Sequence, residues 1–370
     1  MKNNIYLASR QLLFGLGVFF RRPTAGNMLR IVRFLFRRYA LSEPVPFSVV
    51  YAVTYKCQCR CVHCSVSDYG VSEDELDTSQ ALGVIDSIAD WGAVKITFFG
   101  GEPLVREDLC GLAAYAAARG LRTSLDTNGL FLDSAMAERL RASGIGNVNV
   151  SLDSSDPSVH DSLRMQPGCF AAAVGAIKNC VAAGIPCLVS TYASKRSLKE
   201  GDLQKLIVLA RELGASGVKI LFPILSGNWR RSEEERLDPE EEKKLLSLTD
   251  PAYVYIEDAL QMVKSRGKGC SAMERNLVYI SPTGDVQPCP AIPVSFGNIR
   301  KRKLSEIAAF MNGHPFFAKY GKCSMCLMNE PGFREKLFPE LSSASGGLQP
   351  GRTVKLPVDI EELGSLLDKK

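Results

Sequence analysis

Four cysteines fall within eight residues of this 370-residue chain, and their spacing has the clearest chemical meaning in the sequence. They are Cys57, Cys59, Cys61 and Cys64, in the run CQCRCVHC. Zinc sites usually join two separated pairs of ligands, whereas these cysteines share one tight loop. A short loop can instead wrap an iron–sulfur cluster and direct thiolates to separate irons. The twelve cysteines of the chain are too dilute for a small disulfide scaffold, so the loop predicts an iron–sulfur site.

A strand–helix alternation begins at Phe47 and places the cysteine loop directly after the first predicted strand. The predicted strands lie at 48–54, 94–99, 122–127, 147–153, 186–192 and 217–222, and the predicted helices at 78–91, 107–119, 133–143, 169–183 and 200–213. Strands separated by helices predict an α/β fold with a parallel sheet, either open and doubly wound or barrel-like. Polar and glycine residues crowd the carboxyl ends of the strands, where such folds place active sites.

Three of the loop cysteines carry a family resemblance. Cys57, Cys61 and Cys64 have the spacing C-x3-C-x2-C, and in this the sequence resembles the radical S-adenosylmethionine (radical SAM) enzymes over about residues 47–225. The residue before the last cysteine is typically aromatic in that family, and here it is His63. The resemblance implies a partial (βα)6 TIM-like barrel and a 4Fe–4S cluster whose fourth iron binds SAM. An electron from the cluster would cleave SAM to a 5′-deoxyadenosyl radical that abstracts hydrogen from a substrate.

Further contacts with SAM are implied by the same resemblance. They are Gly100, Gly101, Glu102 and Pro103 in a GGEP segment, Asn128 in a TNG turn, and then Ser151, Asp153, Arg164 and His63. In the family the GGEP segment binds the methionine amine, and the resemblance assigns Ser151 to the methionine or ribose part and Arg164 to the carboxylate. The alternative for Asp153 is an Asx turn that opens the next loop. No catalytic side chain is assigned, because the cluster and SAM carry the chemistry.

The remaining cysteines of the barrel region have simpler interpretations. Cys59 is expected to point away from the cluster, with a substituting ligand as the alternative. The other four fall in helix or strand patterns and are interpreted as small buried hydrophobes: Cys110, Cys169, Cys180 and Cys187.

A second set of cysteines lies in the last hundred residues: Cys270, Cys289, Cys323 and Cys326. It resembles the auxiliary-cluster extension of radical SAM proteins called SPASM, in its shortened "twitch" form, because no cysteine follows Cys326. Four thiolates can complete all ligand places of one further 4Fe–4S cluster, which implies electron transfer and not substrate binding. A structural zinc is the alternative, because two separated cysteines and a C-x2-C also suit a tetrahedral site.

The positive charge of the chain belongs to its N-terminal arm. Residues 1–47 carry eight basic residues and one acid, and the rest is nearly balanced, so no nucleic-acid-binding body is predicted. The apolar run 11–20 is too short to span a bilayer, and Arg21 and Arg22 stand where a signal peptide would be cleaved. Apolar and basic residues then alternate with a helical rhythm. This predicts an amphipathic helix on an anionic membrane surface, or one docked on its own catalytic domain with snorkelling arginines.

The predicted organisation has five parts: a basic amphipathic arm 1–46, a radical SAM core 47–228, a charged helical linker 229–265, an auxiliary-cluster domain 266–338 and a flexible tail 339–370. The predicted function is that of a radical SAM oxidoreductase acting on a hydrophobic small molecule, a tetrapyrrole or a lipid side group. The alternatives are a maturase that modifies a ribosomally made peptide, and a non-enzymatic iron–sulfur electron carrier or zinc protein. We expect a cytoplasmic protein, peripheral to the inner face of the membrane, reduced by a flavodoxin or ferredoxin.

Overall fold

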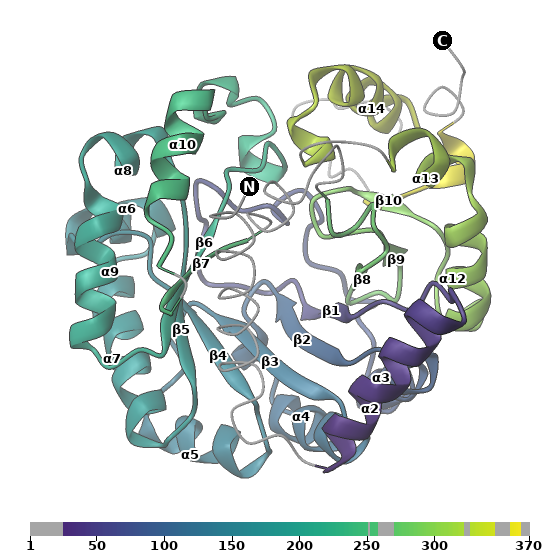
Figure 1. Cartoon of the computed structure of the whole chain (residues 1–370), viewed down its shortest axis with the longest axis horizontal. Coiled ribbons are helices and arrows are strands. Elements are labelled where there is room, and N and C mark those ends of the chain that lie inside the picture. Colours follow the sequence, from purple (N-terminus) through teal and green to yellow (C-terminus); the bar gives the residue numbers. More distant parts are fainter. Residues whose placement is uncertain (1–24, 251, 258–269, 322–325, 345–355, 364–370) are drawn as a thin grey trace.

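The computed structural model of the chain describes residues 25–250, 252–257, 270–321, 326–344 and 356–363. Within these ranges, a nine-stranded sheet has the order β7-β6-β5-β4-β3-β2-β1-β8-β9 (Figure 1). All neighbouring strands are parallel except β8 and β9. The order from β1 to β7 follows the chain without a reversal. The sheet is therefore wound in one direction like a partial barrel, and the doubly wound alternative is excluded.

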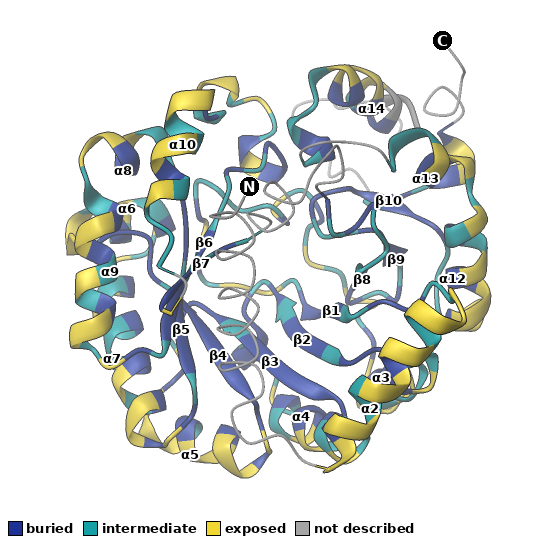
Figure 2. Cartoon of the chain, viewed as in Figure 1, coloured by how far each residue is buried: buried dark blue, intermediate teal, exposed yellow. Residues whose placement is uncertain are grey.

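The six predicted strands and five predicted helices of the core are all present. The strands are β1 Ser48–Thr54, β2 Lys95–Gly100, β3 Arg122–Thr127, β4 Asn147–Ser151, β5 Cys187–Tyr192 and β6 Gly217–Leu221. The matching helices are α3 Thr78–Trp91, α4 Leu109–Ala118, α5 Ser134–Ala142, α7 Cys169–Ala182 and α9 Asp202–Glu212. Two short helices, α6 Pro157–Arg164 and α8 Lys195–Lys199, follow β4 and β5 and were not predicted. Figure 2 shows the strands buried and the outer faces of the helices exposed.

Local sequence signals explain where these helices start and stop. Asp77 and Gln80 form a capping box at the start of α3, and Gly92 ends the helix with a φ of 100°. Apolar side chains between the sheet and the helices, such as Ile85 and Phe98, are fully buried. Burial of this apolar surface is the main force that holds the helices on the sheet.

The other face of the sheet carries buried polar side chains. Asn149 donates from Nδ2 to Asp126 Oδ1 at 2.5 Å, and Asn147 donates to Asn149 Oδ1 at 3.0 Å. Ser151 lies two residues further along β4, on the same face. These hydrogen bonds reduce the desolvation cost of a polar interior, although Asn147 Oδ1 is buried without a partner among the described residues.

The N-terminal arm packs on the body through its arginines. Helix α2, Ala25–Leu35, is followed by a π-helical turn, Phe36–Ala40. Arg30 donates to three main-chain carbonyls at the ends of α3 and α4, over 2.7–3.1 Å, and Arg37 donates to the Trp91 carbonyl at 2.7 Å. These carbonyls carry the negative end of the helix dipoles, which attracts guanidinium groups. Of the two predicted arrangements, residues 25–40 therefore adopt the one in which the helix docks on its own catalytic domain.

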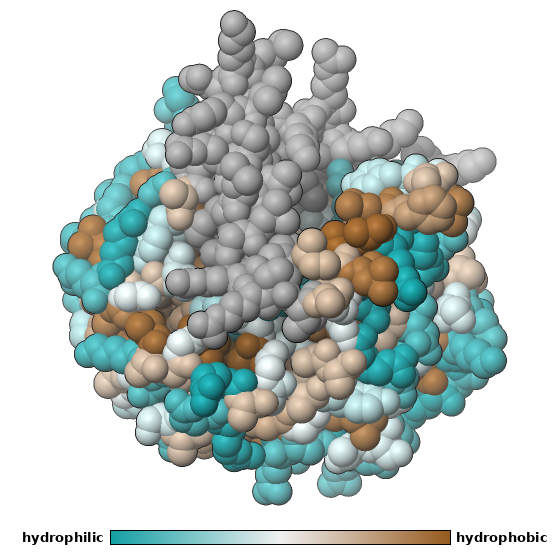
Figure 3. Space-filling model, turned by 60° about the horizontal axis from the view of Figure 1, so that its bottom comes forward, coloured by the Kyte–Doolittle hydropathy of each residue, from teal (hydrophilic) through white to brown (hydrophobic). Residues whose placement is uncertain are grey.

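The opposite face of this segment is apolar and exposed. Its large side chains are 47–75% exposed: Met28, Leu29, Val32, Leu35, Phe36, Tyr39 and Leu41. Figure 3 shows hydrophobic side chains gathered to the right of the grey atoms on the face that carries α2. Arg30 and Arg37 thus face the protein together with the buried Phe34, while most of the large apolar side chains face outward, unlike the predicted snorkelling arrangement. The apolar run 11–20 lies outside the described residues, and no helix within those residues is long and apolar enough to cross a membrane.

The C-terminal part extends the same sheet. Strand β8 Leu277–Ile280 pairs in parallel with β1, and β9 Val286–Gln287 pairs with β8. The predicted helical linker 229–265 contains helix α10, Pro239–Ser247, but also strand β7, Val254–Ile256, which pairs with β6. The two outer strands of the predicted core, β6 and β1, therefore pair with segments that were expected to be a linker and a separate domain.

The expectation of a flexible tail from 339 is wrong for part of that segment. Helices α12 Leu304–Gly313 and α13 Pro315–Tyr320 precede α14, Pro331–Ala344, which runs across the predicted boundary. Strand β11, Val358–Asp359, pairs in parallel with β10, Val294–Ser295. Val358 and Ile360 are buried, so apolar burial holds residues 358–360 on the body.

Candidate active site

The carboxyl ends of β1 to β6 surround a cavity of about 560 Å³. Its walls include the cysteine loop, Gly100 and Gly101 after β2, Asp126 and Asn128 at the end of β3, and Ser151 at the end of β4. The volume falls within the roughly 300–1,000 Å³ typical of small-molecule sites. The sheet therefore brings most of the predicted contacts to one place, although their sequence positions are far apart.

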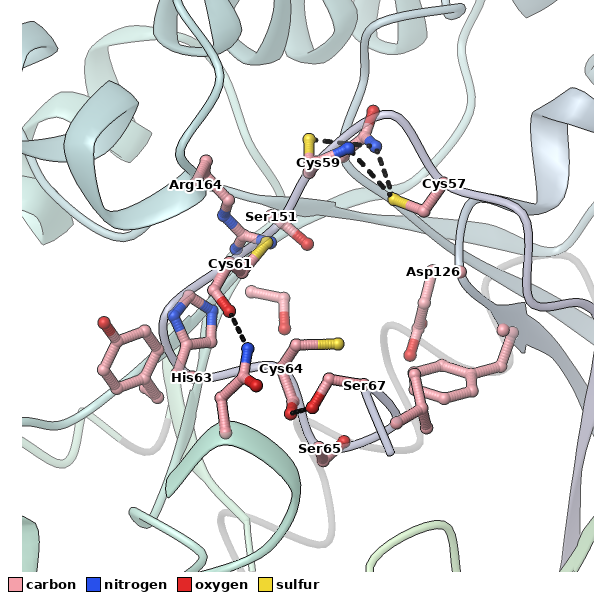
Figure 4. A pocket seen from close by; sticks show the side chains of 18 of the residues that line it. Cys57, Cys59, Cys61, His63, Cys64, Ser65, Ser67, Asp126, Ser151 and Arg164 are labelled. Atoms are coloured by element: carbon pink, nitrogen blue, oxygen red, sulfur yellow. Dashed lines mark hydrogen bonds between the residues drawn. The ribbon is translucent and has the colours of Figure 1, made fainter. Parts of the chain in front are cut away.

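Three sulfur atoms of the cysteine loop face a common open space (Figure 4). They belong to Cys57, Cys61 and Cys64, of which Cys57 is exposed and Cys61 buried. A hydrogen bond from Cys59, together with the Arg164 guanidinium, lowers the pKa of Cys61 to about 6. Burial raises the pKa of Cys64 to about 11. Among the described residues no three His, Cys, Asp or Glu side chains lie close enough to hold one metal ion.

Cys59 also lines the cavity, and its Sγ lies 3.6 Å from Asn128 Nδ2, so the structure does not bear out the expectation that it points away. It packs with Cys169, the first residue of α7, in a small buried cluster that also contains Cys61. A hydrogen bond with Cys59, followed by interaction with His160, lowers the pKa of Cys169 to about 5. Cys169 was interpreted as a plain buried hydrophobe; it is buried, but its thiol also lies against that of Cys59 and interacts with it. No local signal indicates this contact, because the two residues are far apart in the chain.

The GGEP segment separates into two parts. Gly100 and Gly101 line the cavity, and a Cβ atom at Gly100 would stand 2.0 Å from the Thr54 carbonyl oxygen. At Gly101 a Cβ atom would lie 2.5 Å from the Lys56 carbonyl oxygen. The glycines thus let the end of β2 touch the chain that leads into the cysteine loop. Pro103 does not line the cavity.

Glu102 holds the neighbouring turn and does not face the cavity, unlike the implied direct contact with SAM. Its carboxylate accepts hydrogen bonds from Thr127 Oγ1 at 2.7 Å, the Asn128 amide at 2.8 Å and the Leu104 amide at 3.1 Å. The side chain is fully buried, and burial raises its pKa to about 7 in spite of these donors. Glu102 therefore fixes the turn that presents Asn128.

Asn128 reaches from that turn to the cysteine loop. Its Nδ2 lies 3.8 Å from Cys57 Sγ and 3.6 Å from Cys59 Sγ. Its Oδ1 accepts from the Leu130 amide at 2.9 Å, which orients the amide group. Donors directed at sulfur are one of the means by which proteins tune cluster potentials.

A buried charge network forms the wall behind Cys61. Arg164 Nε lies 2.6 Å from Asp153 Oδ2, and Arg164 Nη1 lies 3.7 Å from Cys61 Sγ. Burial would raise the pKa of Asp153, but the Arg164 guanidinium outweighs it and lowers the pKa. The Asp153 amide donates to His160 Nδ1 at 3.0 Å. The ion pair and this hydrogen bond both fix Asp153, so it does more than start a turn.

His63 is part of an aromatic wall. Its ring centroid lies 4.0 Å from that of Tyr192 and 5.9 Å from that of Trp229. Burial lowers the pKa of His63 to about 3, so the ring is neutral at pH 7. Within the part of the chain that the structure describes, its Nδ1 is buried without a hydrogen-bond partner. Sequence reasoning found neither Tyr192 nor Trp229, since Trp229 was assigned to the linker.

The second cysteine set lies beside the extended edge of the sheet. Cys270 is buried, and Cys289 and Cys326 are partly buried. Cys289 follows β9, and Cys326 caps a short 3-10 turn, Leu327–Asn329. Cys323 lies outside the described residues.

Two family models match the chain. The model of the radical SAM superfamily matches residues 51–207, and the SPASM iron–sulfur cluster-binding domain matches residues 270–329. The second match decides between iron–sulfur and zinc, and the C-terminal region binds an auxiliary iron–sulfur cluster.

Similar proteins of known sequence or structure point in two directions. The chain is 32% identical to the AdoMet-dependent heme synthase of Methanosarcina barkeri, over 76% of this chain and 88% of that protein. It is 29% identical to the PqqA peptide cyclase of Granulibacter bethesdensis, over 75% and 76%. The fold also resembles Streptococcus suis SuiB bound to S-adenosylmethionine, with a TM-score of 0.63, 15% identity, and coverage of 79% and 76%.

Proposed function

Because the chain belongs to the radical SAM superfamily and carries a SPASM domain, we propose that it modifies an alkyl side group of a tetrapyrrole. The observation that carries this proposal is the similarity to a heme synthase over 88% of the length of that protein. The chain is an enzyme that uses SAM and a 4Fe–4S cluster, so the electron-carrier and zinc-protein alternatives are set aside. The tetrapyrrole substrate is the proposed part.

The residues of the cavity fit the cluster and SAM. Three thiols face one open space, which suits three irons of a cluster and leaves one iron for SAM. Cys57, Cys61 and Cys64 would be the ligands, and the main chain at Gly100 and Gly101 would meet the methionine part. The unpartnered Nδ1 of His63 offers a buried polar group to the same ligand.

When bound, the cluster and SAM supply a reductively generated radical that abstracts hydrogen from carbon. The protein holds and shields these groups. Asp153 forms an ion pair with Arg164 behind Cys61, and Asn128 directs an amide donor toward Cys57. The neutral ring of His63 packs against Tyr192 in a tilted arrangement, so this wall excludes water without adding charge.

The auxiliary cluster would be held by Cys270, Cys289, Cys323 and Cys326. Four thiolates would complete its ligand set, which favours electron transfer as its use. We propose residues 47–228 as the region that binds the SAM cluster and residues 266–338 as the region that binds the auxiliary cluster. The shared sheet, in which β8 pairs with β1, indicates that the two regions fold together.

A peptide substrate is the second candidate, favoured by the 29% identity to a peptide cyclase. Within the described residues, the chain before β1 forms only α2 and the turn after it, which dock on α3 and α4. This gives less support for a dedicated peptide-binding unit in that part of the chain. We therefore rank the tetrapyrrole first.

The exposed face of α2 supports a further partner, an anionic membrane surface. Apolar side chains such as Leu29, Val32 and Phe36 are more than half exposed, and the side chain of Arg33 beside them is exposed as well. Amphipathic segments of this kind bind anionic lipids through apolar burial and charge attraction. The electron would come from a flavodoxin or ferredoxin.

Anaerobic turnover with defined substrates tests the proposal. The reconstituted protein would be incubated with dithionite and SAM, and with either iron porphyrins bearing carboxylated side chains or peptides. We expect porphyrin to stimulate formation of 5′-deoxyadenosine and to change in mass. Stimulation by peptide alone would move the assignment to the second candidate.

A further inference from the structure

The segment that follows β6 forms hydrogen bonds with the backbone of the cysteine loop through Asn228. The Asn228 amide donates to the Cys64 carbonyl at 3.0 Å, and its side-chain Nδ2 donates to the Cys61 carbonyl at 2.8 Å. One residue thus holds the carbonyls of two proposed cluster ligands. It lies beyond residues 51–207, where the superfamily model matches.

The residue before Asn228 is shaped for this approach. Gly227 has a φ of 54°, and a Cβ atom there would stand 2.0 Å from the Cys64 carbonyl oxygen and 2.9 Å from Ser65 Cα. Any side chain at this position would push the cysteine loop away. The contact is therefore a close backbone packing, reinforced by the Asn228 amide.

The other end of the same segment is tied to the auxiliary-cluster region. Asn329 donates from Nδ2 to the Pro223 carbonyl at 2.8 Å, and its Oδ1 accepts from the Leu225 amide at 3.0 Å. The Asn329 amide also donates to the Cys326 carbonyl at 2.9 Å. Hydrogen bonds therefore run from a proposed auxiliary ligand, through residues 223–228, to two proposed ligands of the SAM cluster.

A second link joins the two regions near the same place. The Tyr69 hydroxyl donates to the Pro290 carbonyl at 3.0 Å and accepts from Gln287 Nε2 at 2.8 Å. Pro290 and Gln287 flank Cys289, and Tyr69 follows the cysteine loop by five residues. Tyr69 is buried, so this link excludes competing water.

We propose that residues 223–228 form a clamp through which the auxiliary-cluster region sets the geometry of the SAM-cluster loop, with Asn228 and Asn329 as its positioning residues. The proposal rests on the assignment of Cys61 and Cys64 as cluster ligands in the proposed function. The clamp acts on main-chain carbonyls, so it controls how the thiolates surround the iron that binds SAM. Loss of either asparagine should loosen that arrangement and weaken binding of SAM.

The test is a SAM titration of the reduced holoenzyme, followed by the change that SAM causes in the electron paramagnetic resonance spectrum. N228A and N329A should each raise the SAM concentration at half-change by about two- to tenfold, the effect of losing one or two hydrogen bonds. The double variant should show less than the summed effect, because both residues act through one segment. N228D, which keeps the shape but replaces the donor by an acceptor, should be at least as impaired as N228A.

The matched control is N179A. Asn179 lies in α7, and its side-chain Nδ2 donates to the Leu132 carbonyl at 3.0 Å, so this variant also removes one side-chain donor. It should titrate like the unsubstituted protein, and all variants should keep their unfolding temperature by circular dichroism within a few degrees. Unchanged titrations for both N228D and N329A, or fully additive effects, would overturn the clamp. The readout needs no substrate, so it is independent of whether the tetrapyrrole assignment stands.

Discussion

Arg164 and Asp153 form an ion pair with 2.6 Å between Nε and Oδ2, and both side chains are at most one-tenth exposed. The pair stands directly behind Cys61, so the guanidinium lies between the Asp153 carboxylate and the sulfur of Cys61, which is 3.7 Å from Arg164 Nη1. Removal of either partner would leave a buried charge uncompensated.

We expect Asp153→Ala to lower the free energy of unfolding by about 3–5 kcal/mol, because breaking a buried pair leaves the other ion without a partner. Urea denaturation of the cluster-free chain at pH 7 measures this. Glu200→Ala, which breaks the exposed pair with Arg196, is the control and should change stability little. Equal effects of the two substitutions would contradict the buried-pair interpretation.

Glu102 should give the protein a measurable pH dependence. Its pKa of about 7 in the folded protein exceeds the ordinary value of 4.5, so the folded state holds this proton more tightly than the unfolded state. The contribution of Glu102 to the free energy of unfolding should therefore fall as the pH rises from about 4.5 to 7, and stay constant above it.

Comparison with Glu102→Gln isolates this effect, because glutamine does not titrate. The difference in unfolding free energy between the two proteins should change across that pH interval, as measured by urea denaturation at several pH values. Glu138→Gln, on the exposed side of α5, should run parallel to the unsubstituted protein. Parallel curves for Glu102→Gln as well would show that the carboxyl group does not titrate in this range.

Asn128→Ala should lower the reduction potential of the SAM cluster. Amide donors directed at the cysteine sulfurs stabilise the more negative reduced cluster, so their loss disfavours reduction. Spectroelectrochemical titration of the holoenzyme measures the shift, with Asn179→Ala as the control. An unchanged or higher potential would mean that the Asn128 amide does not bond to the cluster ligands.

If the exposed apolar face of α2 binds a membrane surface, a charge placed on this face should weaken that binding. Val32→Glu, at a position that is 60% exposed, should reduce binding to vesicles containing phosphatidylglycerol without lowering the unfolding temperature. The control is Val208→Glu on α9, where the side chain is 55% exposed and the same charge is added. If both variants bind vesicles as well as the unsubstituted protein, the face of α2 is not the docking surface.

The core of the fold could be predicted from the sequence because hydrophobic periodicity and glycine stops are local signals. The cysteine loop was equally visible, because its ligands lie within eight residues. Contacts that depend on the curvature of the partial barrel were not predicted: Asn228 on the loop carbonyls, and Cys169 beside Cys59. No local pattern marks them, since each pair is brought together only by the winding of the barrel.

For the N-terminal arm, a different kind of information was missing from the sequence. Its rhythm predicted two faces but not which one meets the protein, because apolar burial usually decides this. Here the carbonyls at the ends of α3 and α4 bind Arg30, which faces inward together with the buried Phe34, while most of the large apolar side chains face outward. The tail beyond 338 was misjudged for a related reason: pairing of β11 with β10 depends on a partner strand more than fifty residues away.

The ligand assignment predicts different outcomes for neighbouring cysteines. Alanine at Cys57, Cys61 or Cys64 should remove about four irons per reconstituted chain. Cys59→Ala should retain them, because Cys59 is not one of the three cysteines in the C-x3-C-x2-C spacing assigned to the cluster. Iron analysis together with protein quantification measures this, and full iron content in the three ligand variants would contradict the assignment.

The central claim is that the cavity performs SAM-dependent radical chemistry on a tetrapyrrole. The most direct measurement is anaerobic incubation of the reduced holoenzyme with SAM and an iron porphyrin, with 5′-deoxyadenosine and porphyrin mass followed together by liquid chromatography and mass spectrometry. The account predicts 5′-deoxyadenosine that depends on porphyrin, with a matching porphyrin product, and neither in the Cys61→Ala variant. Formation of 5′-deoxyadenosine that porphyrin does not stimulate, with the porphyrin unchanged, would contradict it.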